Sequence, residues 1–503
     1  MNPMNWLVVQ PEIVLLVMAC VVALADLFVK DERRRPTFWL SQLSLAAVAF
    51  IQVDQLGAMM QAEQLGNGLT SMYGMQQMVV ADPMGRLLSV CATLTLMATL
   101  AYAQPYIGSR DMLKGEFFSL SMLSLLGVLV MLSANNFLVV YLGLELMTLS
   151  LYALVALRRD HAVSTEAAMK YFVLGALASG FLLYGMSMMY GATGTLEIGG
   201  VFDAIQTGRL NRDVLTFGLV FIVAGLAFKL GVVPFHMWVP DVYQGAPTAV
   251  TLLIAGAPKL AAFGITIRLL HEGMNGLARD WQQMLIVLAV ASLVIGNLAA
   301  IAQTNLKRLL AYSTIAQLGF MLLGLTPTVV GGNTVSAANG YSSALFYLIT
   351  YVLTTLASFG IIMLLARQGF EAEEIKDLAG LGKRSPWMAG VMLIVMFSLA
   401  GIPPTVGFYA KLAVLQALVT TGEAAYITLA VVAVVLSLIG AFYYLRVVKV
   451  MYFDEPAESM QISGPAGARA LLAVNGAAVL VLGLVPSGLM ALCRDVIVKA
   501  LAT

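Results

Sequence analysis

The sequence predicts an all-α integral membrane protein with about 14 transmembrane helices, on three observations. Of its 503 residues, 60% are hydrophobic and only 11% are charged, whereas about 25% of residues are charged in a soluble domain. Apolar windows of about 20 residues, the length of helix that crosses a bilayer, follow one another along the whole chain. Basic residues are also distributed unevenly between alternate loops, as in multi-pass proteins of fixed orientation.

The first window lacks the basic start of a signal peptide, so we expect it to remain as the first transmembrane helix. The apolar windows lie at residues 6–29, 37–59, 83–103, 116–133, 135–157, 166–190, 214–234, 248–270, 281–303, 308–327, 341–366, 387–418, 424–448 and 469–491. We expect a single polytopic membrane domain over 1–503, made of N-terminal helices in 1–103, a first repeat in 116–270, a second repeat in 281–448 and a C-terminal helix in 469–503.

The basic residues orient these windows. Four of the 28 lysines and arginines lie inside windows: Lys170, Lys229, Lys259 and Lys411. Seven lie on the side of the termini: Arg86, Arg209, Arg212, Arg268, Arg279, Arg494 and Lys499. The other 17 of the 28, in segments such as "KDERRRP" and "LKRLL", lie on the side of the first loop. The positive-inside rule therefore predicts that both termini lie outside the cytoplasm.

The sequence lacks the signals of several classes of function. Cys20, Cys91 and Cys493 are far apart and form no CxxC pair, so we expect neither zinc nor an iron–sulfur cluster in this chain. The sequence contains neither a P-loop nor a dinucleotide fingerprint in a strand–turn–helix setting. The net charge is +1 and the basic residues form no stripe or tail, so we expect no nucleic acid as a partner. We expect no cofactor in this chain and no soluble small-molecule substrate bound directly, only membrane lipid around it.

Charged residues inside the windows are the candidate functional residues: Glu145, Lys170, Lys229, Lys259 and Lys411. A lysine near the bilayer centre costs on the order of 3 kcal/mol by insertion scales. A purely structural role would favour paired opposite charges, yet one central carboxylate faces several ammonium groups. Lys170 has an ordinary alternative, because it follows Glu166 by four residues at a helix start and can form an ion pair there.

These groups are suited to relay protons. Burial penalises an ammonium, a second ammonium nearby penalises it further, and a carboxylate offsets both effects. At an effective dielectric constant of about 20, unit charges roughly 8 Å apart interact by about 2 kcal/mol, so the groups titrate as a coupled set. We predict proton transfer by Glu145, Lys229, Lys259 and Lys411. His236 titrates near neutral pH and is either a tentative further relay group or a hydrogen-bond donor at a helix end.

Prolines interrupt two windows beside these lysines, in "KLGVVPFHMWVPD" and "GIPPTVGFYAK". A proline inside a span frees a backbone carbonyl, which must find water or a polar partner, so broken helices line hydrated paths in transporters. The two breaks fall in spans 7 and 12, five apart. We therefore predict two inverted five-helix repeats, spans 4–8 and 9–13, in which Lys229 and Lys411 occupy equivalent positions.

"KLGVVPFHMWVPDVYQGAPTAVT", "NLKRLLAYSTIAQLGFML" and "GIPPTVGFYAKLAVL" together resemble the antiporter-like membrane subunits of bacterial NADH:quinone oxidoreductase, respiratory complex I. The resemblance covers essentially the whole chain. Two members of that family differ from it: subunit M has a glutamate in place of Lys411, and subunit L has a long C-terminal lateral helix.

The resemblance implies a function and a set of roles. The chain would translocate protons in the membrane arm, beside subunit M and the small membrane subunits, while FMN, iron–sulfur clusters and quinone would be bound by partner subunits. Glu145 and Lys229 would form the ion pair of the first half-channel, with Lys170 as modulator. Lys259 would connect to Lys411, the terminal lysine of the second half-channel.

One position departs from the family, because Gln317 stands where related subunits often have a histidine. Glutamine does not titrate, so a relay there must pass through water. Two other functions remain open. A subunit of a multisubunit Mrp-type cation/proton antiporter, or of a membrane-bound hydrogenase or formate-linked complex, would share the fold. In a structural scaffold, the buried charges would fix assembly only.

Overall fold

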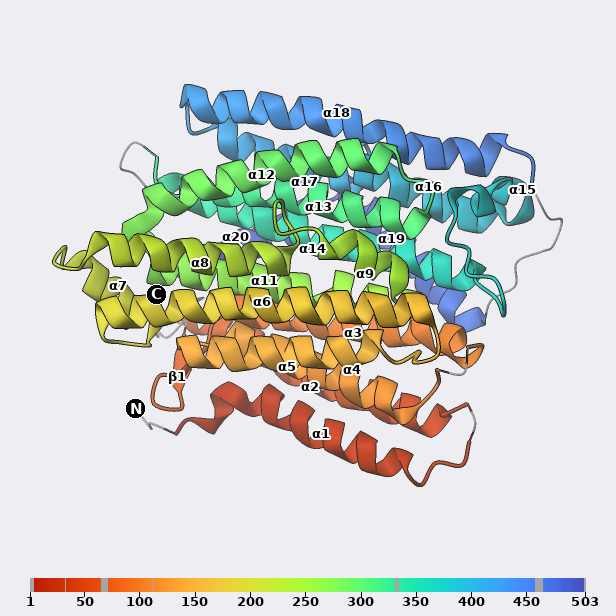
Figure 1. The fold of residues 1–503 in the computed structure, drawn as a ribbon, viewed down its shortest axis with the longest axis horizontal. Helices are drawn as coiled ribbons and strands as arrows, with labels where there is room; N and C mark the ends of the chain where they lie inside the picture. Colours follow the sequence, from red (N-terminus) through yellow and green to blue (C-terminus); the bar gives the residue numbers. More distant parts are fainter. Residues whose placement is uncertain are drawn as a thin grey trace.

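In the computed structural model, which describes residues 4–31, 33–64, 71–110, 112–330, 334–456 and 465–501, the described chain is almost entirely helical. Its long helices lie alongside one another, with α1 (Gln10–Asp26) at one edge and α18 (Ala424–Phe453) at the opposite edge (Figure 1). The predicted all-α class is therefore confirmed.

The N-terminal helices precede the first repeat, with a short hairpin of strands between them. Their bounds are η1 (Trp6–Val9), α1, α2 (Arg35–Gln64), β1 (Met72–Gly74), β2 (Val79–Ala81) and α3 (Pro83–Gly108). The strands pair antiparallel, with Met72 opposite Ala81. η1 and the C-terminal helix α20 (Ser487–Leu501) lie at the same end of the helices, on the left in Figure 1.

The two repeats follow in chain order. The first comprises α4 (Gly115–Ser133), α5 (Phe137–Val155), α6 (Ala162–Thr193), α7 (Ile198–Gln206), α8 (Arg212–Leu230), α9 (Trp238–Gly245), α10 (Thr248–Ala255), α11 (Ala257–Ile267), the π-helical turn η2 (Arg268–Gly273) and η3 (Asn275–Leu277). The second comprises α12 (Ala278–Ile301), α13 (Leu306–Leu325), α14 (Val335–Leu365), η4 (Ile375–Leu378), α15 (Leu381–Arg384), α16 (Pro386–Ala400), α17 (Val406–Val419) and α18. α19 (Ala466–Leu484) and α20 complete the fold.

The helix packing reflects this repetition. The first two helices of each repeat, α4 with α5 and α12 with α13, pack against each other. The third helix of each repeat packs against its own broken helix, α6 against α8 and α14 against α17. The described residues contain 13 helices long and apolar enough to cross a membrane. The window at 387–418 is the additional span and consists of two short apolar helices, α16 and α17.

Two details of the predicted spans are different in the structure. The last window, 469–491, contains the end of α19 at Leu484 and the start of the separate helix α20. The eighth span is also broken, because Gly256 leaves helical geometry (φ −97°, ψ −106°) between α10 and α11. Pro258 follows at the start of α11, where a backbone N–H would have no acceptor within the helix, so proline loses no hydrogen bond there. The sequence analysis predicted breaks in spans 7 and 12 only.

Asparagine and aspartate side chains start several of the spans. Asn136, Asn211 and Asn305 cap α5, α8 and α13 through hydrogen bonds to backbone N–H groups, and Asp82 caps α3 in the same way. Such a cap satisfies a donor that the first helical turn leaves unpaired. The capped ends fix where each span begins.

Two of the residues singled out in the sequence lie in spans that are enclosed by other helices. We compare the most apolar stretch of each span. In that stretch, 94% of the residues are buried in the span Thr248–Gly273 and 89% in Leu306–Leu325, but only 28% in Ala424–Phe453. α10, α11 and α13 are thus enclosed by other helices, whereas α18 lies at the edge (Figure 1). Lys259 and Gln317 belong to the enclosed spans.

Candidate functional site: two broken helices and their lysines

The first break ends α8 at Leu230. Gly231 adopts a left-handed conformation (φ +81°), which glycine tolerates without a Cβ clash. Its N–H donates to the carbonyls of Ala227 and Phe228, at 2.9 and 3.0 Å. The next two carbonyls, those of Lys229 and Leu230, therefore need donors from elsewhere in the protein.

Lys259 supplies those donors. Its Nζ lies 3.0 Å from the carbonyl oxygens of both Lys229 and Leu230, and the residue is 1% exposed. An ammonium is also favoured at the negative end of a helix dipole. The Nζ lies 5.0 Å from the ring centroid of Trp238, whose indole N–H donates across the break to the Phe228 carbonyl at 3.0 Å. One lysine thus closes the open end of α8.

Lys229 itself lies in the last turn of α8 and is 8% exposed. Its Nζ lies 3.3 Å from the hydroxyl oxygen of Ser179 on α6. Glu145 lies partly buried on α5, and its Oε1 is buried without a hydrogen-bond partner in the described part of the chain. No ion pair joins Glu145 to Lys229 among the described residues. The implied pair is therefore not in direct contact in this structure.

Lys170 forms the ordinary ion pair predicted for it and a second one as well. Its Nζ lies 2.9 Å from Glu166 Oε1 and 2.8 Å from Asp241 Oδ2. Asp241 also accepts from Arg308 Nη1 at 2.8 Å. Lys170 is partly exposed and has these acidic partners instead of Glu145, so the structure does not bring the implied modulator to the glutamate that it would modulate.

The second break repeats the geometry of the first. α16 ends at Ala400, and Gly401 (φ +85°) donates to the Phe397 and Ser398 carbonyls at 2.9 and 3.1 Å. Lys411, half-buried on α17, then closes the end of α16. Its Nζ lies 3.1 and 2.9 Å from the carbonyls of Leu399 and Ala400, and 2.8 Å from the Ser437 hydroxyl.

The predicted equivalence of Lys229 and Lys411 is therefore wrong. Lys229 lies two residues before the left-handed Gly231, and the residue two before Gly401 is Leu399. Lys411 instead makes the contacts that Lys259 makes at the first break. Lys229 precedes its break and Lys411 follows its own, so a similar distance from the nearest proline does not make them equivalent.

Gln317 lies beside the second break. Its Nε2 donates to the Leu399 carbonyl and the Tyr444 hydroxyl, both at 2.9 Å, and its Oε1 accepts from the Tyr347 hydroxyl. These contacts border a small cavity of about 10 Å³, whose other lining includes Tyr351. That volume is close to the room needed by one water molecule, and the polar walls supply partners for it.

His236 lies half-buried in the first break. Its Nδ1 is buried and has no hydrogen-bond partner among the described residues. Asp241 lies in the first turn of α9, after the N-cap position held by Met237. Neither side chain therefore caps α9, and the tentative relay role of His236 stays a prediction.

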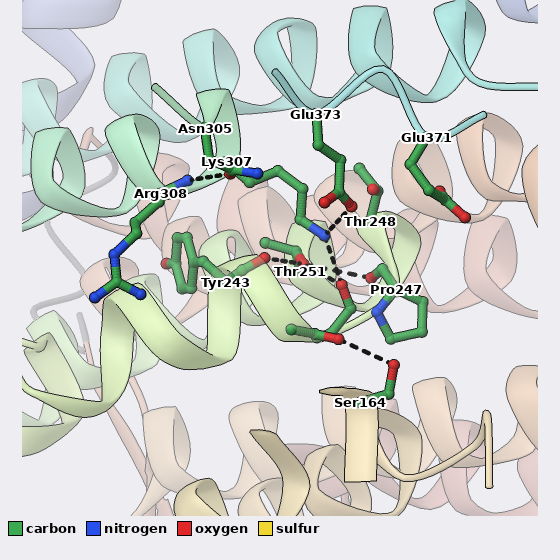
Figure 2. A network of polar contacts seen from close by, with 12 residues as sticks. Ser164, Tyr243, Pro247, Thr248, Thr251, Asn305, Lys307, Arg308, Glu371 and Glu373 are labelled. Carbon is green, nitrogen blue, oxygen red and sulfur yellow. Dashed lines mark hydrogen bonds and ion pairs between the residues drawn. The ribbon is translucent and has the colours of Figure 1, made fainter. Parts of the chain in front are cut away.

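The sequence analysis missed Lys307, which it assigned to a basic loop. Lys307 lies in the first turn of α13 and is 1% exposed. Figure 2 shows its ammonium between Glu373 and a backbone carbonyl; Nζ lies 2.9 Å from Glu373 Oε1 and 2.7 Å from the Ala246 oxygen. The adjacent Arg308 makes the segment look like a loop, and only the folded position of Glu373 shows that Lys307 has a buried partner.

The hydrogen bonds at the two breaks suit both the charged and the neutral form of the lysine. Lys259 donates to two carbonyls, and a neutral amine still has two N–H groups for them. At Lys411, Ser437 can donate to the amine once the proton has left, because a hydroxyl both donates and accepts. Both lysines can therefore change charge while every hydrogen bond is kept.

Comparison with known proteins extends this picture. Residues 134–437 match the family described as "NADH:quinone oxidoreductase/Mrp antiporter, TM". Over 497 residues the chain is 63% identical to "NADH-quinone oxidoreductase subunit N" of Polaromonas naphthalenivorans, covering 98% of this chain and 97% of that protein. A chain of respiratory complex I from Thermus thermophilus has a TM-score of 0.77 and 30% identity, covering 96% of this chain and 99% of that one. A chain of the Mrp complex from Dietzia sp. has a TM-score of 0.79 at 22% identity, covering 99% and 97%, and shows the shared fold alone.

Proposed function

The chain belongs to the family of NADH-quinone oxidoreductase subunit N, and we propose that it is a proton-translocating subunit in the membrane arm of such a complex. It couples quinone reduction in partner subunits to proton transfer across the membrane. The relatives that carry this name match the chain over nearly its whole length, and the solved complex I chain has the same fold. The chain is a multi-pass membrane protein, and we assign it to the bacterial inner membrane with both termini periplasmic.

The observation that carries the proposal is the absence of counter-charges at three lysines. Among the described residues, Lys229, Lys259 and Lys411 contact hydroxyl and carbonyl oxygens and make no ion pair. A structural lysine inside a membrane protein is normally paired, because an isolated charge is costly in a medium of low dielectric. Neutral partners instead allow the proton to leave, which is what a relay requires.

We infer a mechanism that is consistent with the positions of these groups. Quinone reduction in the partner subunits changes the charge at Glu145, whose unpaired Oε1 is free to take a proton. The change alters the affinity of Lys229 for its proton. That proton passes to Lys259, which is bonded to the carbonyl of Lys229 itself. Water carries it on past Gln317 to Lys411, and release is to the periplasmic side.

Redox chemistry takes place in other chains under this proposal. FMN, iron–sulfur clusters and quinone are bound by partner subunits, and this chain contacts subunit M, the small membrane subunits and lipid. The three cysteines of this sequence, Cys20, Cys91 and Cys493, lie far apart along the chain, a spacing that does not suit a cluster. An Mrp-type antiporter is less well supported, because its likeness to this chain lies below 25% identity.

Purification tests the assignment. The chain is tagged, the membranes are solubilised in mild detergent, and the purified material is run on a native gel stained for NADH dehydrogenase activity. We expect a large active band that contains flavin and iron–sulfur subunits. A smaller assembly without redox activity would overturn the proposal in favour of an antiporter. In reconstituted vesicles, Lys229→Met should lower NADH-driven proton translocation while the complex still assembles, and full translocation by that variant would contradict the relay.

A further inference from the structure

Lys307 and Glu373 form an ion pair that joins the surface to the interior. The side chain of Lys307 is 1% exposed, whereas that of Glu373 is 24% exposed. Glu373 belongs to the segment between α14 and η4, and this segment is fixed to the start of α13. There the Ile375 N–H donates to the Thr304 carbonyl at 2.9 Å, and Asn305 Nδ2 donates to Glu374 Oε1 at 3.3 Å. The carboxylate is thus held at the boundary between solvent and the buried ammonium.

The second partner of Lys307 places it at the seam between the two repeats. Its Nζ lies 2.7 Å from the carbonyl of Ala246, the C-cap of α9. The same carbonyl accepts from the Thr251 hydroxyl at 3.4 Å. α9 is the second half of the broken span that carries Lys229 in its first half. The pair therefore touches the end of one broken helix from the first turn of α13.

Two buried hydroxyls near this end lack partners. Thr248 Oγ1 and the Tyr243 hydroxyl oxygen are buried and have no hydrogen bond within the described residues. Figure 2 shows both residues in the network around Lys307. Buried polar atoms almost always find a protein group or an ordered water, so each of these hydroxyls marks a position for water. Water at these positions would give Lys307 a proton acceptor on its inner side, whereas Glu373 lies on its outer side.

We propose that Glu373 and Lys307 form a proton-uptake port on the side of the first loop. The inference rests on the proposed function. Lys307 gives a proton from its ammonium to a water beside the Thr248 hydroxyl and becomes a neutral amine. Glu373 takes a proton from bulk water and passes it to that amine. One proton has then moved inward, and the ion pair has its original charges.

Glu373 is the acidic residue placed to pass a proton to Lys307, because the other carboxylates nearby have partners of their own. Of the other acidic groups near it, Glu371 accepts from the Tyr106 hydroxyl and Arg110 at 2.8 and 2.9 Å. Asp241 is bonded to Arg308 and Lys170, and Asp377 accepts from the backbone of Glu374. Each of these carboxylates has its own cation or hydrogen-bond donor. Within the described residues, Glu373 is the carboxylate that contacts Lys307.

The proton moves onward along hydroxyls of α13 and α14. Thr314 lies on α13 two helical turns beyond Lys307, and it accepts from the Tyr351 hydroxyl at 2.8 Å. Tyr351 borders the small cavity that Gln317 also lines. The port therefore opens toward the second break and Lys411, independently of Glu145.

Arginine separates a proton-transfer role from a structural one. It keeps the positive charge and donates to both the carbonyl and the carboxylate, but it does not release its proton in proteins. We would purify the intact complex with Lys307→Arg and reconstitute it, then measure NADH-driven proton uptake by the vesicles against the rate of NADH oxidation. A positioned proton-transfer group typically contributes at least about 100-fold, so we expect proton uptake to fall about tenfold or more. Glu373→Gln should have the same effect, and Glu373→Asp should restore much of the rate.

The matched control is Lys383→Arg, at an exposed ion pair with Glu455, which should leave proton uptake unchanged. Normal proton uptake by Lys307→Arg, in a preparation in which Lys229→Met still abolishes it, would overturn the port and leave the proposed function intact. Normal uptake by both variants would overturn the proposed function. Loss of assembly in Lys307→Arg would assign the pair a structural role and also overturn the port, with Glu373→Gln as the check because Gln keeps an oxygen acceptor for Lys307.

Discussion

The two broken helices are closed in the same way by lysines that come from different places. At the first break, Lys259 reaches α8 from the next span, and Lys229 lies inside α8 with Glu145 on a neighbouring helix. At the second break, Lys411 comes from the second half of the same broken span. Gln317 contacts the Leu399 carbonyl there, and the position that matches Lys229 is Leu399, an apolar residue.

This difference shows two separate roles for the charged residues: one lysine at each break closes a helix end, and Lys229 with Glu145 can respond to a charge. Both breaks need a donor for two carbonyls, and a lysine provides it in each. Only the first break adds a second lysine and a nearby carboxylate. The first half is therefore suited to respond to an electrostatic signal, and the second half is suited to pass on the proton that it receives.

The largest expected effect distinguishes the two closing lysines. Lys259→Met leaves two buried carbonyls without donors, and each unsatisfied buried group costs about 1–3 kcal/mol. Lys411→Met costs less, because Gln317 still donates to the Leu399 carbonyl. Thermal dissociation of the purified complex, followed on native gels, should show the larger loss for Lys259→Met. Equal losses would mean that Gln317 does not support the second break.

Glu145→Gln should affect activity strongly and stability little. The substitution removes the acidic group from the first half, and a change of about 1.4 kcal/mol in a rate-limiting proton transfer is tenfold in rate. We expect NADH-driven proton translocation to fall by about that factor. Glu423→Gln, at an exposed carboxylate near the second repeat, is the control. Equal activity of the two variants would remove the distinction between the halves.

A titratable group can be added to the second half with Gln317→His. Histidine is neutral at pH 8 and gains a positive charge only in part as the pH falls, because burial and the nearby Lys411 both oppose that charge, and the added charge would oppose a proton on Lys411. We expect proton translocation close to that of the parent at pH 8 and about two- to threefold lower at pH 6, a modest effect of a charge screened by water. A pH profile unchanged by the substitution would show that Gln317 lies off the path.

The smallest expected effect concerns Glu371, which joins the segment after α14 to the end of α3. Burial opposes ionisation, but hydrogen bonds from Arg110 and Tyr106 hold the pKa of Glu371 below its usual value. A lowered pKa in the folded state stabilises it above the unfolded value of about 4.3, and this contribution is lost as pH falls through the lower folded value. The partly exposed pair contributes at most about 1 kcal/mol. The dissociation temperature at pH 7 should drop slightly in Glu371→Gln, and that difference should disappear near pH 3.

Much of the fold follows from the sequence, because membrane spans depend on local composition. A window of apolar residues is helical wherever it lies in the bilayer, so thirteen of the windows coincide with the 13 apolar helical spans of the described chain, one of them broken at Gly256, and 387–418 matches the pair α16 and α17. The breaks at Pro234 and Pro404 were visible for the same reason. The break at Gly256 was missed, although Pro258 gives the same proline signal two residues later. The close approach of α3 at this glycine, where a Cβ would lie 2.7 Å from Thr95, is visible only in the fold.

The site was less predictable, because it depends on contacts between distant segments. The sequence identifies Lys229, Lys259 and Lys411 as costly charges, and all three belong to the broken spans. It does not identify the carbonyls that each ammonium contacts, so Lys229 and Lys411 were wrongly matched. Lys307 followed by Arg308 reads as a loop, since its burial depends on Glu373, 66 residues further along the chain.

The hydrogen bonds of Lys259 have a kinetic consequence. Because both of its carbonyl contacts are available to the ammonium and to the amine, the heavy atoms around Nζ need to move little when the proton leaves. The reorganisation energy of the transfer is then small, and the forward and backward barriers are lowered together. A site built in this way has no preferred direction of its own. The sign of the proton-motive force and the redox drive of the complex decide which way it runs, and a steep enough gradient would drive it in reverse.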